Sequence, residues 1–221
     1  IGAPCEPLVK PGEKVLVGQK IGDSKSFVSA PVHASVSGEV IAIGPYAHPS
    51  GQMVEAITIE SDGQDLWEQP VFPGGDWEEL SPVDIRRLIR EAGIVGLGGA
   101  AFPAHVKLAP PPDKPIDTVI LNGAECEPYL TADHRLMLEQ PQQVITGLKV
   151  ILKVLGAKQG IIGIEDNKLD ALRVISQEIE GQKGIQVVSL RTKYPQGAEK
   201  MLIQAITRRK VPAGGLPMDV G

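Results

Sequence analysis

A glycine-rich run at residues 93–107 holds residue types suited to gripping a flat, charged ligand. Three glycines lie within residues 96–99, and Phe102 and Lys107 follow them. Glycine lets the backbone approach a ligand closely, and consecutive N–H groups form a concavity that binds anions. The phenyl ring can lie against a planar ligand, and the lysine is a point charge for a phosphate or a ring edge. Such runs also occur in plain turns, so residues elsewhere must decide between the two interpretations.

Two more polar clusters stand beside predicted elements. The run 122–129 contains an asparagine, two carboxylates and a tyrosine after a buried strand at 118–122, and these groups can hold ring edges and sugar hydroxyls. The alternative is an Asn/Glu-rich loop that caps a helix. The run 194–200 places a glycine at the entrance of a helix predicted at 198–207, which suits an anion or a planar ligand. A third cluster, 165–167, is interpreted as structural, with Asp166 or Asn167 capping the next helix.

No side chain is assigned as a catalytic nucleophile or a metal ligand. Cys126 stands between two glutamates, which oppose thiolate formation. His105 and His134 have no identifiable Ser or Cys partner, so hydrolase chemistry is not expected. His33 and His48 lack ligand-spaced partners, so no metal site is predicted.

Composition limits the class of protein. The chain has 221 residues, 42% of them hydrophobic, a mean hydropathy near zero and a net charge of −5. No apolar run reaches the roughly 20 residues of a membrane span, and the absence of a basic stripe argues against a nucleic-acid partner. Two cysteines are too few for a four-cysteine iron–sulfur cluster and fit a reducing cytoplasm. The first residues lack both Met and the basic start of a signal peptide, so we expect part of a longer protein.

The elements that must position these clusters fall into two predicted domains. Residues 1–65 contain short strand-like runs between turn signals, which predict a small all-β unit. Residues 66–81 are predicted to be a linker whose two tryptophans pack on one domain or both. Residues 82–221 open on a Ser-Pro helix start and then alternate strands and helices. This alternation predicts an α/β fold with a mainly parallel sheet, in which ligands bind beyond the carboxyl ends of the strands.

The first segment resembles the barrel-sandwich hybrid of biotinyl and lipoyl domains. In that family a lysine at a hairpin tip carries the cofactor. Lys25 is the nearest candidate here, but it lacks the flanking acidic residues and spacing of that family. A structural docking role is therefore favoured over a swinging arm.

Three motifs together resemble the C subunit of Rnf-type ion-translocating electron-transport complexes. They are GLGGAAFPAHVKL at 96–108, NGAECEPYLTAD at 122–133 and YPQGAEK at 194–200. The resemblance covers essentially the whole chain, including the β-domain and VPAGGLP at 211–217. That family is similar to the flavin-bearing subunit of respiratory complex I, which implies a Rossmann-like domain that binds FMN and exchanges hydride with NADH.

The resemblance also implies a set of ligand contacts. The flavin contacts would come from Gly96, Gly98, Gly99, Ala100, Lys107, Asn122, Glu125, Tyr194, Gly197, Ala198 and Glu199. Phe102 and Glu127 would face the nicotinamide nucleotide. The flavin carries the redox chemistry, and the protein positions and tunes it.

The resemblance implies an NADH-linked oxidoreductase and translocase subunit on the cytoplasmic face of the bacterial inner membrane, peripheral to it. Electrons would pass between NAD(H) and ferredoxin through FMN and 4Fe–4S clusters that lie outside these residues, and the other subunits would be its partners. Because relatives continue beyond the counterpart of Gly221, we expect this segment to be inactive alone. Ala101 stands where the family usually has glycine, at a cost of about 1 kcal/mol if φ is positive there.

Two rival functions are open at this point. One is a cofactor-free assembly subunit like the A subunit of sodium-pumping NADH:quinone reductases, which a glycine loop without Lys107 or Glu127 would favour; both residues are present. The other is a lipoyl-type carrier, which requires a modified lysine.

Overall fold

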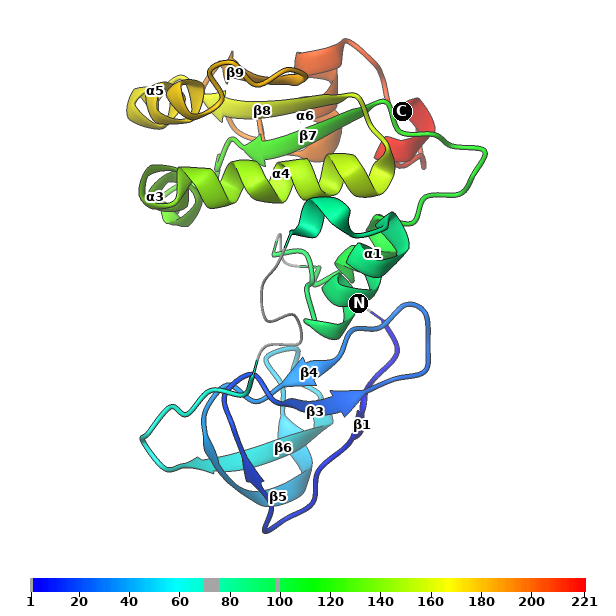
Figure 1. Ribbon diagram of the computed structural model, residues 1–221, viewed down its shortest axis with the longest axis vertical. Coiled ribbons are helices and arrows are strands. Elements are labelled where there is room, and N and C mark those ends of the chain that lie inside the picture. The colour runs from blue at the N-terminus through cyan, green and yellow to red at the C-terminus, as the bar shows by residue number, and fades with distance from the viewer. Residues whose placement is uncertain (1, 70–75, 98–99) are drawn as a thin grey trace. The chain divides into compact units, whose positions relative to one another are not determined.

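The computed structural model describes residues 2–69, 76–97 and 100–221 (Figure 1). Contacts within the chain define two compact units, Ile1–Lys107 and Leu108–Gly221, and each is described here by itself. The predicted helix after residue 81 and the described part of the glycine-rich run therefore belong to the first unit. The domain ranges 1–65, 66–81 and 82–221 stay a prediction.

The first unit begins with two antiparallel three-stranded sheets, in the orders β1-β3-β4 and β2-β5-β6. The strands are β1 (Glu6–Pro7), β2 (Lys14–Val15), β3 (Lys20–Asp23), β4 (Val32–His33), β5 (Gly38–Ala47) and β6 (Met53–Ser61). Both sheets contribute to a small apolar core, which consists of Val9, Val15, Ile21, Ala34 and Val40. The predicted all-β unit is confirmed.

Gly38 shows why the chain needs glycine where β5 meets β6. Its φ is 153°, and a Cβ built there would lie 2.0 Å from the carbonyl oxygen of Glu60. No side chain fits in that space without moving the ladder between the two strands.

Among the described residues, the first unit also contains a 3-10 turn, η1 (Trp77–Glu79), and the helices α1 (Pro82–Glu91) and α2 (Ala104–Lys107). The Ser81 hydroxyl accepts a hydrogen bond from the Asp84 N–H, and Pro82 occupies the first turn of α1. Gly93 has a φ of 67° just beyond the helix end. The predicted start and stop of α1 are thus confirmed.

The second unit is an α/β layer around a parallel sheet in the order β7-β8-β9 (Figure 1). Its elements are β7 (Thr118–Gly123), α3 (Ala132–Glu139), α4 (Pro141–Leu155), β8 (Gln159–Glu165), α5 (Leu169–Glu178), β9 (Ile185–Leu190), α6 (Glu199–Thr207) and η2 (Pro217–Val220). The predicted α/β class with a parallel sheet is confirmed.

Helices cover both faces of this sheet, and two glycines in β8 mark the contacts. A Cβ on Gly160 would lie 3.1 Å from Leu148 and Leu152 of α4. A Cβ on Gly163 would meet Leu202 and Ile206 of α6 at 3.2 and 3.1 Å. Because neighbouring strand residues alternate in direction, positions 160 and 163 face opposite sides. Missing side chains in β8 therefore let a helix approach each face.

Two details differ from the predictions. The helix α3 was not predicted. The predicted cap of α5 is wrong: Asp166 accepts hydrogen bonds from the Thr192 backbone and hydroxyl, and the N-cap residue of α5 is Lys168, which makes no side-chain cap bond. Within the described residues, no helix combines the length and apolar character needed to cross a bilayer.

We expect Gly38→Ala to destabilise the first unit by roughly 2 kcal/mol or more, because the Glu60 carbonyl occupies the space of the new methyl group. Urea denaturation followed by circular dichroism measures the effect. Gly44→Ala in the same strand is the matched control, since no atom lies within 4 Å of the place its methyl group would take. Equal midpoints for the two variants would contradict the prediction.

Candidate functional site

A cleft of about 330 Å³ lies in the second unit, beyond the carboxyl ends of the parallel strands. Its walls come from the loop after β7, the start of α3, the loop after β8 and the loop after β9. The lining residues are Glu125, Cys126, Glu127, Pro128, Tyr129, Leu130, Thr131, His134, Glu165, Asn167, Lys168, Thr192, Lys193 and Tyr194. This is the edge of the sheet at which the sequence predicts ligand binding.

The loop after β7 is joined directly to the segment before α6. The Asn122 Nδ2 donates to the Gly197 carbonyl at 2.8 Å, and the Gly197 N–H donates to the Cys126 Sγ at 3.2 Å. A Cβ on Gly197 would lie 3.2 Å from that sulfur and 3.4 Å from Ala124 and the Asn122 Oδ1. Gly197 is therefore a packing glycine, and the structure brings it together with Asn122.

Glu125 caps the helix that the sequence did not reveal. Its Oε1 accepts from the Asp133 N–H at 2.7 Å, and its Oε2 accepts from the His134 N–H at 3.1 Å. The N-cap residue Thr131 makes no side-chain cap bond. The side-chain cap comes from six residues before Thr131, so the local pattern, a threonine followed by Asp133 in the first turn, does not reveal it. The alternative of a helix-capping loop therefore describes Glu125 in this structure.

A buried ion pair lines the inner side of the cleft. The sequence interpretation places Glu165 in a structural cluster but does not identify Lys168 as its partner. Glu165 is 1% exposed and Lys168 is 6% exposed, and the Lys168 Nζ lies 3.8 Å from the Glu165 Oε2. The same Nζ donates to the Ala124 carbonyl at 2.8 Å and to the Glu125 carbonyl at 3.4 Å. Lys168 thus holds the loop after β7 against the end of β8. The available signal was a carboxylate ending an apolar strand, with a lysine three residues later.

Carboxylates give the cleft an acidic side. Partial loss of hydration raises the pKa of the Asp133 carboxyl, and the Glu125 and Glu127 carboxylates raise it further; the residue as a whole is exposed. The Lys168 ammonium opposes them. The lining of the cleft itself contains Glu125, Glu127 and Glu165 together with Lys168 and Lys193. Its carboxylates can accept hydrogen bonds from hydroxyl and amide groups of a ligand.

The remaining predicted residues of this unit are exposed. Tyr194 is 70% exposed and lines the cleft with Glu127. Ala198 is the N-cap residue of α6, and Glu199 lies in its first turn, near the positive end of the helix. The structure therefore brings Asn122, Glu125, Glu127, Tyr194 and Gly197 to one edge of the sheet.

The glycine-rich run lies in the first unit. Backbone hydrogen bonds join residues 94–96 to residues 102–104, and this paired segment is here called the neck. The Gly96 N–H donates to the Phe102 carbonyl at 2.8 Å, and the Ala104 N–H donates to the Ile94 carbonyl at 3.0 Å. Beyond the neck, Lys107 is exposed at the end of α2. Two predicted contacts, Gly98 and Gly99, lie outside the described residues.

Ala101 is the position of the run at which the sequence departs from the pattern of the family. Ala101 has a φ of 47°, which is the left-handed region that favours glycine. The expected strain of an alanine at this position is therefore present. Ala100, a predicted contact, is exposed next to it.

Comparison with known proteins gives this arrangement a family. Residues 89–221 match the family described as the Nuo51 FMN-binding domain, and residues 1–64 match the RnfC barrel sandwich hybrid domain. The chain belongs to the Nuo51 FMN-binding domain family. The match includes the glycine-rich run and every element of the α/β unit, and the preceding β-unit agrees with the predicted barrel-sandwich hybrid.

Relatives of the whole chain are C subunits of oxidoreductase complexes. The chain is 55% identical over all 221 residues to the C subunit of the Na(+)-translocating ferredoxin:NAD(+) oxidoreductase complex of Acetobacterium woodii, and covers 50% of that protein. It is 55% identical to the C subunit of the proton-translocating complex of Clostridium ljungdahlii, and covers 48% of it. It is 45% identical over 223 residues to its counterpart in the ion-translocating oxidoreductase complex of Pseudomonas aeruginosa, and covers 29% of it. The chain thus spans about half the length of the first two relatives, and the predicted resemblance to Rnf C subunits is confirmed.

We expect Lys168→Met to lower the free energy of unfolding by roughly 3–5 kcal/mol, because Glu165 would stay buried without its cation. The double variant Glu165→Gln, Lys168→Met should be less destabilised than Lys168→Met alone. Chemical denaturation of the four forms of this cycle measures the coupling. Lys200→Met, at an exposed position in α6, is the control. A Lys168→Met variant as stable as the control would refute the role of the pair.

The raised pKa of Asp133 predicts a pH-dependent effect of Asp133→Asn. An unfolded aspartate has a pKa of about 3.9, and the pKa of the folded carboxyl lies above that value. Ionised Asp133 therefore lowers the folding stability at neutral pH. This effect disappears as the pH falls from above the folded pKa to below the unfolded pKa. We expect the Asn variant to be more stable than the parent at pH 7, with the difference closing below about pH 3.9. Denaturation curves at both pH values test this, and a constant difference would contradict it.

Proposed function

We propose that this chain is the flavin-holding part of an NAD(H)-linked electron-transport complex. In this proposal it binds FMN, receives NAD(H) beside it, and passes electrons between NAD(H) and ferredoxin through 4Fe–4S clusters carried elsewhere in the parent protein. It would work as an oxidoreductase and translocase subunit, at the cytoplasmic face of the membrane and together with the other subunits. The relatives' names, which specify ferredoxin:NAD(+) oxidoreductase complexes, support this assignment.

The observation that carries the proposal is the cleft at the carboxyl edge of the β7-β8-β9 sheet in a domain of an FMN-binding family. Its volume lies at the lower end of the range for pockets that hold cofactors, about 300–1,000 Å³. Its wall offers the Tyr194 ring for stacking and carboxylates for ribityl or ribose hydroxyls. The donor set fits the planar and hydroxyl-bearing parts of a flavin or nicotinamide nucleotide. In the first unit, Lys107 supplies an exposed cation of the kind a phosphate needs.

The residues divide into ligand-facing groups and groups that shape the cleft. Glu127 and Tyr194 line the cleft and are exposed there, where a nucleotide can meet them. A contact of Phe102 with the nicotinamide nucleotide is proposed separately, from the resemblance of the glycine-rich run. Glu125 and Asn122 already make protein hydrogen bonds, so we propose that each binds ligand through its remaining acceptor positions. Bound FMN supplies the hydride and one-electron chemistry. The chain's own groups orient the ring, hold its hydroxyls and exclude water from its face.

We expect Glu127→Gln in the complete protein to reduce the rate of NADH-dependent reduction of an artificial acceptor about tenfold, as loss of a charge-assisted contact would. Flavin content should be nearly unchanged, because Glu127 is proposed to face the nicotinamide nucleotide. Stopped-flow reduction and flavin absorbance measure the two effects. Glu180→Gln, at an exposed site beyond α5, is the control. Loss of flavin without a separate effect on NADH would move Glu127 to the flavin contacts.

Lys107→Met tests the flavin assignment itself. Losing a cation at the phosphate should weaken FMN affinity by about tenfold, which fluorescence titration measures. Lys10→Met, at an exposed position of the first unit, is the matched control. The intact mass of the parent protein tests the carrier alternative, which requires a modified Lys25. A parent protein that binds no FMN, with Lys25 unmodified, would favour the cofactor-free assembly subunit.

A further inference from the structure

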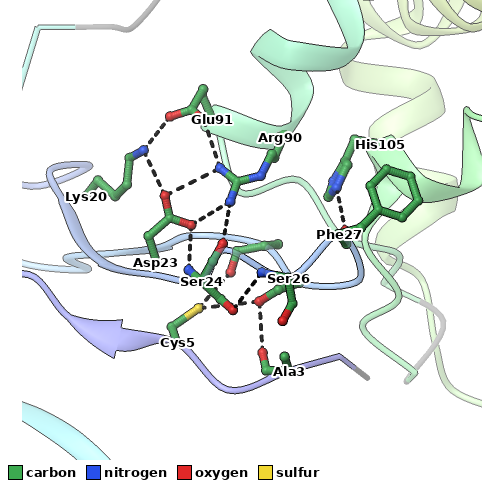
Figure 2. Close-up of polar contacts among 12 residues, drawn as sticks. Ala3, Cys5, Lys20, Asp23, Ser24, Ser26, Phe27, Arg90, Glu91 and His105 are labelled. Carbon is green, nitrogen blue, oxygen red and sulfur yellow. Dashed lines mark hydrogen bonds and ion pairs between the residues drawn. The ribbon is translucent and has the colours of Figure 1, made fainter.

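The β-sheets of the first unit make a set of contacts with the helix that precedes the glycine-rich run. The Arg90 Nη2 donates to the Asp23 Oδ1 at 2.7 Å and to the Ser24 carbonyl at 2.8 Å, as Figure 2 shows. The Arg90 Nη1 donates to the Glu91 Oε1 at 2.8 Å. Lys20 bridges the two carboxylates, lying 3.3 Å from the Asp23 Oδ2 and in contact with Glu91.

This network differs from an ordinary surface ion pair. Its four side chains are only 24–28% exposed, and their charges alternate in a closed ring. A forked guanidinium contact with a carboxylate also fixes orientation. The Lys20 hydrogen bond lowers the pKa of Glu91 despite its partial burial. The end of α1 is therefore fixed on the loop that follows β3.

The backbone beyond α1 also packs on the same β-sheets. Gly93 lies so close to them that a Cβ would be 2.7 Å from the Pro31 carbonyl oxygen and 2.9 Å from the His33 ring. The His33 Nε2 is 3.0 Å from the Glu91 carbonyl oxygen. These contacts fix the strand that enters the neck of the glycine-rich run.

The segment that follows the neck, at the start of α2, also contacts the loop after β3. His105 of α2 is buried, and its Nε2 is 3.0 Å from the Phe27 carbonyl oxygen (Figure 2). Its ring meets the Phe27 ring edge-on, with centroids 5.8 Å apart. Residues 24–31, here called the 24–31 loop, thus lie against both arms of the neck.

The 24–31 loop is itself fixed, so it can serve as a support. The Ala3 N–H donates to the Val28 carbonyl at 2.9 Å, and the Ser29 hydroxyl donates to the Ala3 carbonyl at 2.8 Å. The Cys5 Sγ donates to the Ala30 carbonyl at 3.2 Å.

We propose that the 24–31 loop is a positioning element for the cofactor site, which braces the neck of the glycine-rich run and holds Lys107 in place. This inference rests on the proposed function, in that the run is the part of the first unit that meets the flavin. In the structure the 24–31 loop and the residues beside it contact the segment that contains the neck, through Arg90, Gly93 and His105. These three are positioning residues, since they act through the neck.

The test is a charge exchange across the brace. Arg90→Asp places two carboxylates together, and Asp23→Arg with Arg90→Asp restores an opposite pair. Arg87→Asp is the matched control, because Arg87 is on the same helix, is 67% exposed and pairs only at 3.4 Å with Asp84. A second variant, His105→Leu, removes the other arm's hydrogen bond while keeping an apolar side chain.

The first measurement needs no flavin: hydrogen exchange of the Gly96 and Ala104 amides, which close the neck. We expect hydrogen exchange to be about tenfold faster in Arg90→Asp and in His105→Leu, and near the parent rate in Arg87→Asp. The double variant should recover in part, because it restores opposite charges at positions 23 and 90 but leaves like charges beside Lys20 and Glu91. The second measurement is the FMN affinity of the complete protein, determined by fluorescence. We expect the affinity to be about tenfold weaker in the same two variants and to recover in part in the double variant Asp23→Arg, Arg90→Asp.

Each outcome decides the matter. Unchanged neck exchange in Arg90→Asp and His105→Leu would overturn the brace. Faster exchange with unchanged FMN affinity would overturn its positioning role. A parent protein that binds no FMN would overturn the proposed function, while the exchange rates would still report on the brace. Recovery by the charge exchange excludes a general loss of folding.

Discussion

The buried ammonium of Lys168 is the interaction on which the cleft depends. Three parallel strands end at one edge, and the loops that follow them must be held together without regular hydrogen bonding. Lys168 joins the loop after β7 to the end of β8, because it donates to the carbonyls of Ala124 and Glu125 and pairs with Glu165. Glu165 in turn accepts a hydrogen bond from the Lys193 N–H in the loop after β9. With that loop fixed, the Glu125 carboxylate can cap α3 and Asn122 can meet Gly197. A chain of polar contacts thus shapes the rim of the α/β unit above its apolar core.

Sequence reasoning recovers the features that local patterns encode. The helix at 141–155 is bounded by Pro141 and Gly156 and carries an apolar face, and β9 is a short apolar run. It fails where the cause lies far away in the chain. The cap of α3 comes from Glu125, which local capping rules do not inspect. Asp166 resembles a cap but bonds Thr192, because the end of β9 lies beside it in space. Lys168 would be expected on a surface, and only the fold shows its partners.

In the candidate site, too, the sequence predicts some features and not others. The sequence identifies the residues that reach the carboxyl edge, since Asn122, Glu125, Glu127 and Tyr194 follow or precede predicted elements. It cannot assign their roles, because these depend on competition for hydrogen bonds. Asn122 and Glu125 support the protein itself, whereas Glu127 and Tyr194 face the cleft. The description of the family names FMN, and the geometry separates the groups that shape the cleft from those that are exposed in it.

The contacts of Arg90 also bear on how the chain is made. Asp23 and Ser24 precede Arg90 by more than sixty residues, so this pairing closes a long loop. A ribosome releases the β-strands first, and chains of this kind fold their N-terminal parts during synthesis. All residues of the surface that receives Arg90 and His105 are therefore synthesised before either of these two. The entropy cost of ordering the glycine-rich run arises when the run packs on residues that precede it in the chain.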